Sequence, residues 1–165
     1  MKLTPILHIL SILIMPLSGF MIISGLVDLV YNDENWINFF SSAIITFFVG
    51  MSVFLATTGN EDQNIDLRQA FVLTTMSWIT IAFFGALPFY LSDINLNFTN
   101  SFFESMSGIT TTGSTILTNI ELSPPGILVW RSLLQWLGGI GVIVMAIAIF
   151  PMLSVGGMQL FKAEN

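Results

Sequence analysis

The chain has 165 residues, of which 54% are hydrophobic and only 8% are charged. Because an ordinary soluble domain is about 25% charged, this composition excludes a soluble globular protein and indicates a membrane protein. The net charge of −6 argues against a nucleic-acid partner, and the lack of cysteine excludes disulfides and thiolate metal sites.

Long intervals without any charged residue divide the chain, at 3–27, 35–60, 69–92 and 132–161. Each interval exceeds the roughly 20 apolar residues that a spanning helix needs, so four membrane crossings are expected. The first interval follows Lys2, but no small-residue cleavage site closes it before Asp28. It is therefore interpreted as a retained helix and not as a signal peptide.

The first two predicted helices, 5–30 and 37–57, form an N-terminal pair within residues 1–58. The polar connection between them has an aromatic residue at each end, which is typical of a turn at the headgroup level. In the second helix Ser42, Thr46 and Gly50 recur every four residues. This small-residue stripe predicts close packing against a neighbouring helix.

A hydrophilic cytoplasmic connection, 59–68, is expected to separate this pair from a second unit, 69–165. The third helix is predicted over 69–91, with Pro88 tolerated because it lies near the end. The fourth helix is predicted to begin after a Ser-Pro-Pro-Gly run and to continue to about Phe150, where the next proline kinks or stops it.

The charge distribution favours one orientation. With a cytoplasmic N-terminus, Lys2, Arg68 and Lys162 all lie inside, whereas the connections at 31–36 and 92–123 carry acids and no Lys or Arg. Cytoplasmic loops carry the excess of Lys and Arg. The sequence therefore predicts a multi-pass membrane protein with its N-terminus in the cytoplasm.

Residues 92–126 are too many and too apolar for a plain loop. Ser101 and Glu104 have the spacing of a capping box, which predicts a short helix over Phe102–Gly108. Such a helix rises only about 10 Å and cannot cross a membrane. The segment is therefore expected to enter from the outer face and to return to it.

Small hydroxyl side chains and a glycine follow this short helix over residues 110–115. Non-helical backbone at membrane depth must be buried in protein or line a watery cavity. Gly113 allows a positive φ, and a row of carbonyls can replace the water shell of an alkali cation, beside the negative end of the helix dipole. The pattern by itself fits an ion filter and an ordinary hydroxyl-rich turn equally well.

Two runs, FFESMSGITTTGST at 102–115 and WRSLLQWLGGIG at 130–141, resemble the first pore repeat of TrkH-type potassium-uptake subunits, which belong to the Trk, Ktr and HKT superfamily. The resemblance covers the whole chain, because two leading helices precede the first helix–pore loop–helix unit in the TrkH branch. It implies an all-α membrane protein with a re-entrant pore helix and filter. It also implies filter carbonyls from Thr111, Thr112, Gly113 and Ser114, flanked by Thr110 and Thr115, with K+ bound through Thr111 and Thr112.

Members of this family carry four such repeats in one chain, whereas this sequence contains one. The chain is thus expected to supply one quarter of a potassium-selective pore, as an N-terminal fragment or the product of a split gene. The resemblance implies potassium as the transported substrate and no cofactor. The implied partners are the lipid bilayer, the remaining repeats in cis or in trans, a second complete subunit in a homodimer, and a cytoplasmic nucleotide-binding regulatory subunit.

Two charged residues beside the predicted filter are candidates for its structural support. Glu104 is either a helix cap or a contact of the ions, and Arg131 either snorkels or pairs with Glu104 or with loop carbonyls. Gly138, Gly139 and Gly141 are interpreted as positions of helix crossing in preference to a hinge.

Two other classes of function remain open. A short chain of this kind could conduct nothing and act as an assembly or regulatory partner of full-length subunits. An intramembrane hydrolase would need a base beside its hydroxyl nucleophile, but the sole histidine, His8, is expected on the opposite side of the membrane. The sequence therefore predicts a protein that is not an enzyme.

Overall fold

The computed structural model describes residues 3–59 and 67–162, and the surroundings of side chains within 3–59 and 68–144. The described residues form helices joined by short connections, without any strand. In chain order the helices are α1 (Thr4–Val30), α2 (Trp36–Thr57), α3 (Leu67–Gly85), α4 (Leu87–Leu91), α5 (Phe98–Ile109), a 3-10 turn (Ile120–Leu122) and α6 (Pro125–Lys162).

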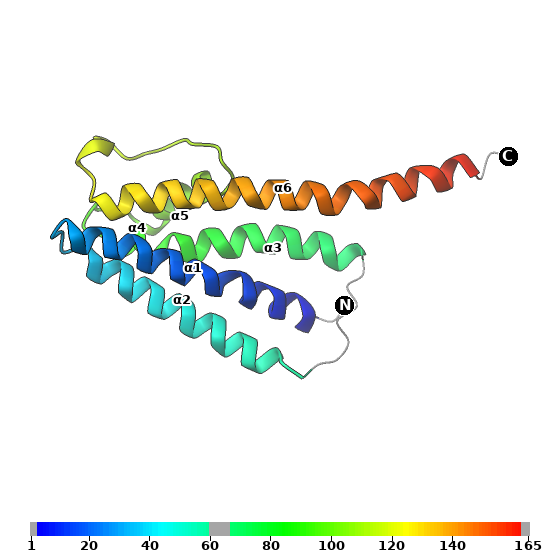
Figure 1. Ribbon diagram of the computed structural model, residues 1–165, viewed down its shortest axis with the longest axis horizontal. Coiled ribbons are helices and arrows are strands. Elements are labelled where there is room, and N and C mark those ends of the chain that lie inside the picture. The colour runs from blue at the N-terminus through cyan, green and yellow to red at the C-terminus, as the bar shows by residue number, and fades with distance from the viewer. Residues whose placement is uncertain (1–2, 60–66, 163–165) are drawn as a thin grey trace.

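The expected four crossings are confirmed as helices. Within the described residues, four helical stretches are long and apolar enough to span a bilayer: Thr4–Val30, Trp36–Thr57, Arg68–Leu91 and Pro125–Val144. Figure 1 shows them side by side, with the turn between α1 and α2, helix α4 and the start of α6 at one end of the bundle. The chain is a multi-pass, all-α membrane protein.

The small-residue stripe of α2 lies against α1, as predicted. Ser42, Thr46 and Gly50 are buried, and the Thr46 hydroxyl lies 3.7 Å from the sulfur of Met21. A Cβ on Gly50 would lie 3.1 Å from a side-chain carbon of Ile14. Small side chains let the two backbones approach, because lipid tails supply no hydrophobic force between helices.

Two predicted helix boundaries differ from the structure. The third crossing is interrupted at Ala86, between α3 and α4, because Pro88 has no N–H to donate to the preceding turn. Helix α6 does not end at Phe150 but continues through Pro151 to Lys162. A proline in a membrane helix breaks one hydrogen bond, and the adjoining turns keep theirs.

The two halves of the chain share one apolar core. Buried side chains from α1, α2, α4 and α6 meet there, including Met21, Phe39, Phe89 and Trp130. The indole Nε1 of Trp130 also donates to the Gly85 carbonyl oxygen at 3.0 Å. The division of the chain at 59–68 stays a prediction, because residues 60–66 and Lys2 lie outside the described residues.

Candidate functional site

Helix α5 begins four residues earlier than predicted. Its N-cap is Asn97, whose side chain accepts a hydrogen bond from the backbone N–H of Asn100 at 2.9 Å. Ser101 lies inside the helix, where its hydroxyl donates to the Asn97 carbonyl oxygen at 3.0 Å. The predicted capping box of Ser101 and Glu104 is therefore wrong, because asparagine, a strong N-cap residue, stands one turn earlier.

The longer helix still falls short of a crossing. Twelve residues rise about 18 Å, compared with about 30 Å for the hydrocarbon core of a bilayer. Figure 1 shows α5 starting at the same end of the bundle as α4, and the chain after it returning along α6 to the start of α6. This course is the geometry that a re-entrant segment requires.

Helix α5 packs closely against α6. A Cβ on Gly108 would lie 3.0 Å from Cβ of Leu134, and a Cβ on Gly138 would overlap the carbonyl oxygen of Ile109, the last residue of α5. Gly138 is therefore a position of helix crossing, as predicted. Gly139 has no such neighbour, since a Cβ there would meet nothing within 4 Å.

The backbone turns sharply where α5 ends. Gly113 has the expected positive φ, +77°, and Thr111 also has a positive φ, +57°, which the sequence reasoning missed. Residues other than glycine seldom adopt this conformation. The N–H groups of Thr111 and Thr112 donate to the carbonyl oxygens of Gly108 and Ser107 at 2.9 and 3.0 Å. These bonds hold Thr111 and Thr112 against the end of the helix.

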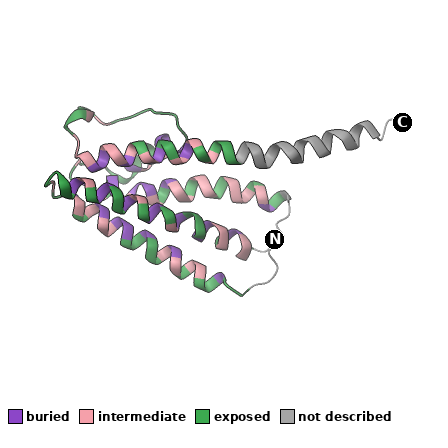
Figure 2. Cartoon of the chain, in the orientation of Figure 1, coloured by how far each residue is buried: buried purple, intermediate pink, exposed green. Residues whose placement is uncertain are grey.

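The loop that follows is exposed, whereas the helix below it is largely buried (Figure 2). Residues 110–116 are exposed, and most of the last turns of α5 are buried. The Ser107 hydroxyl donates to the Ser114 carbonyl oxygen at 2.6 Å and ties the loop to α5. The exposed residues carry mostly hydroxyl side chains on non-helical backbone, which requires either water or a covering protein surface.

The far end of the loop is held by a buried carboxyl group. The Glu104 side chain is 1% exposed, and its Oε1 accepts from the Thr115 hydroxyl at 2.6 Å and from the Ile116 backbone N–H at 2.7 Å. Its Oε2 accepts from Nη1 of Arg131 at 2.6 Å. The pairing of Glu104 with Arg131 is thus present, and it connects α5, the loop and α6.

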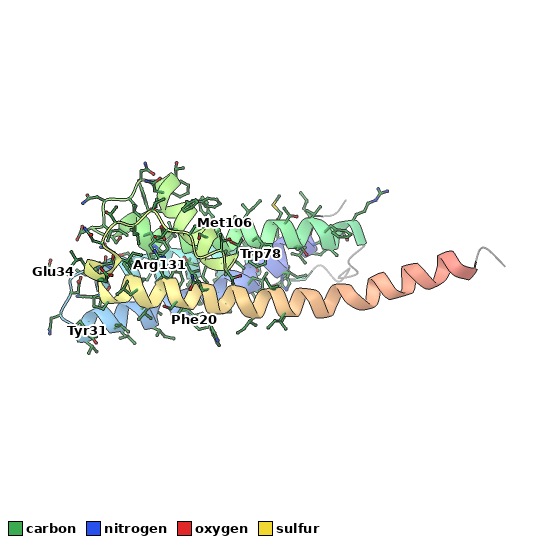
Figure 3. The ribbon with its side chains drawn as sticks, turned by 90° about the horizontal axis from the view of Figure 1, so that it is seen from above. Phe20, Tyr31, Glu34, Trp78, Met106 and Arg131 are labelled. Atoms are coloured by element: carbon green, nitrogen blue, oxygen red, sulfur yellow. The ribbon has the colours of Figure 1, made fainter. Side chains whose placement is uncertain are left out.

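Arg131 reaches the loop directly as well. Figure 3 labels Arg131 on the first turns of α6, beside the loop, and its Nη1 donates to the Thr115 hydroxyl at 2.7 Å. Thr115 therefore contacts both members of the ion pair. Hydrogen bonds that involve a charged partner are roughly twice as strong as neutral ones, so this cluster fixes the position of the chain between Thr115 and Ile116.

Two side chains beside the loop, Ser107 and Gln135, were not predicted from the sequence. The residues that line the narrow hollow between α5, the loop and α6 are Glu104, Ser107, Gly108, Gly113, Ser114, Arg131 and Gln135. Ser107 lies one turn after Glu104 on α5, and Gln135 lies one turn after Arg131 on the same face of α6. Helical spacing of three or four residues is the signal that could have found both.

The single histidine lies far from this loop. Nδ1 of His8 is 2.9 Å from the hydroxyl oxygen of Thr57, at the last residue of α2. Figure 1 places that end of α2 at the opposite end of the bundle from α4. His8 therefore supplies no base to the hydroxyl groups of the loop.

Comparison with known proteins gives consistent results. Residues 36–165 match the TrkH family, described as cation transport protein. The Trk system potassium uptake protein TrkI of Halomonas elongata is 45% identical over 98% of this chain and 32% of its own length. The corresponding protein TrkH of Escherichia coli is 42% identical over 96% of this chain and 33% of its own length.

The fold agrees with a solved structure. The crystal structure of the potassium transporter TrkH from Vibrio parahaemolyticus matches 95% of this chain and 34% of its own, with a TM-score of 0.87 and 33% sequence identity. The chain thus spans about a third of the length of the relatives it matches.

Proposed function

Because this chain belongs to the TrkH family of cation transport proteins, we propose that it forms the N-terminal third of a potassium-uptake subunit and supplies one quarter of its pore. One observation carries the proposal: a helix too short to cross a bilayer ends in an exposed, non-helical loop rich in hydroxyl side chains, over residues 110–116. The relatives are named potassium uptake proteins and align with almost the whole chain.

In the proposed mechanism, potassium sheds water and binds to carbonyl oxygens of Thr111, Thr112, Gly113 and Ser114, with Thr110 and Thr115 flanking them. Carbonyl dipoles can replace the hydration shell of the ion, and the negative end of the α5 dipole favours a cation at the same place. The positive φ of Gly113 lets the backbone change direction within the filter. Glu104 and Arg131 are the structural support that keeps the filter open at its far end.

The exposed side of the loop implies assembly. Backbone groups without partners cost several kcal/mol each in lipid, so the loop needs the three missing repeats around it, in cis or from partner chains. We also propose a homodimer of complete subunits in the cell inner membrane, with a cytoplasmic N-terminus and a cytoplasmic nucleotide-binding regulatory subunit. The connections at 31–36 and 92–123 contain acidic residues and no Lys or Arg. This distribution supports the proposed orientation, because Lys and Arg are in excess in cytoplasmic loops.

The test is potassium uptake by cells that lack their own uptake systems. Cells that express this chain together with three further repeats should grow at low potassium and accumulate radioactive rubidium, and cells that express the 165-residue chain by itself should not. Uptake by the isolated, monomeric chain would contradict the proposal. A chain that changes the activity of complete subunits, without joining their pore, would instead be a regulatory partner.

A further inference from the structure

A buried carboxyl group lies near the end of α1, outside the pore unit. The side chain of Asp28 is 0% exposed, although a buried carboxyl group in a membrane helix is costly and is retained where it has partners. One carboxyl oxygen accepts a hydrogen bond from the backbone N–H of Gly126, and the other accepts from Nδ2 of Asn35 at 3.0 Å. Its partners are therefore the connection to α2 and the start of α6.

The contact with Gly126 fixes the start of α6. The first N–H groups of a helix lack partners within the helix, and an oxygen acceptor placed there stabilises the helix end. Asp28 plays this part from 98 residues away in sequence. The fit is close, because a Cβ on Gly126 would overlap the carboxyl group of Asp28.

Helix α6 connects this contact to the loop. Arg131 lies five residues after Gly126, which is about 7.5 Å along the helix axis, and it holds Glu104 and Thr115 through bonds of 2.6 and 2.7 Å. A helix is stiff over that distance, so an axial movement at Gly126 carries Arg131 with it. Hydrogen bonds need a narrow range of distance and angle, so such a movement weakens the bonds that Arg131 makes.

We propose that Asp28 is a positioning residue for the ion filter, which sets the height of α6 and hence of Arg131 beside the loop. The leading helix pair thus takes part in ion selection, through the contact of Asp28 with the start of α6. The proposal rests on the proposed transport function, since it concerns how the same loop is held.

The first test exchanges hydrogen-bond donors and acceptors between Asp28 and Asn35. In the complete subunit, Asp28→Asn keeps the size of the side chain but turns one acceptor into a donor, so either Gly126 or Asn35 then faces a second donor. The double variant Asp28→Asn/Asn35→Asp restores an acceptor opposite each donor. The matched control is Glu34→Gln. It also replaces a carboxyl group by an amide, but at an exposed position of the connection between α1 and α2.

The measured quantities are the ratio of potassium to sodium uptake and the amount of subunit in the membrane. We expect Asp28→Asn to lower the ratio by about two- to tenfold, the double variant to recover most of it, and Glu34→Gln to leave it unchanged. A change in selectivity at equal amounts of protein distinguishes positioning from simple support of folding.

Two results would overturn the inference: a wild-type ratio in Asp28→Asn, or the same loss in Glu34→Gln. If Asp28→Asn does not accumulate, Gly126→Ala decides, because its Cβ displaces the same contact from the other side. A reduced ratio in that variant supports the inference, and an unchanged ratio overturns it. Failure of the unaltered subunit to take up potassium would instead refute the proposed function.

Discussion

Replacing Glu104 with glutamine tests how the far end of the loop is held. The carboxyl group accepts from the Thr115 hydroxyl, the Ile116 N–H and Arg131. A glutamine of the same size keeps one carbonyl oxygen for the first two donors, but its amide N–H2 then faces the guanidinium of Arg131. The variant therefore loses the ion pair and gains a contact between two donors.

The size of the effect follows from burial. Glu104 is 1% exposed and Arg131 is 17% exposed, so the pair is largely removed from water. Breaking a buried pair by removing one partner costs about 3–5 kcal/mol, and the lower value, about 3 kcal/mol, applies here because Arg131 can regain some water. That energy corresponds to about a hundredfold change in the equilibrium between two states of the loop: one in which Thr115 and Ile116 are bound to residue 104, and one in which they are not.

The assay is the ratio of potassium to sodium uptake by the complete subunit, together with its thermal unfolding midpoint in detergent. We expect Glu104→Gln to lower both, and Glu121→Gln, at an exposed position of the connection between α5 and α6, to lower neither. In the double variant Glu104→Gln/Arg131→Gln the two losses should be less than additive, since the residues contact one another. Equal selectivity and stability in the two glutamine variants, Glu104→Gln and Glu121→Gln, would refute the reasoning.

Two glycine variants test the conformation of the loop and the packing of α5 against α6. Gly113→Ala should reduce selectivity through backbone strain of about 1 kcal/mol, because the φ of Gly113 is +77° and the nearest atom to a Cβ would be 3.7 Å away. Gly59→Ala, at φ +98° just after α2, should leave the uptake ratio unchanged. Gly138→Ala should displace the Ile109 carbonyl at the end of α5 and reduce uptake and unfolding midpoint together, whereas Gly139→Ala, with open space around its Cβ, should behave as wild type. Equal effects within either matched pair would contradict the corresponding reasoning.

The start of α5 shows why part of the site differs from the prediction. Ser101 and Glu104 have the spacing of a capping box, but Asn97 caps the helix one turn earlier. Glu104 then lies in the second turn, where it contacts Thr115 and Arg131 instead. Several polar side chains near one helix end compete for the same N–H groups, and spacing along the chain does not decide which of them wins.

The sequence by itself determined the four crossings, the small-residue stripe of α2, a helix too short to cross and the positive φ of Gly113. Each depends on a local requirement: a helix in lipid must satisfy its own backbone, and only glycine turns left-handed at little cost. The tertiary structure decided which polar groups meet, such as Asp28 with the start of α6 and Arg131 with Glu104. Such pairs join residues far apart in the chain, and only packing brings the donor of one helix within hydrogen-bonding distance of the acceptor of another.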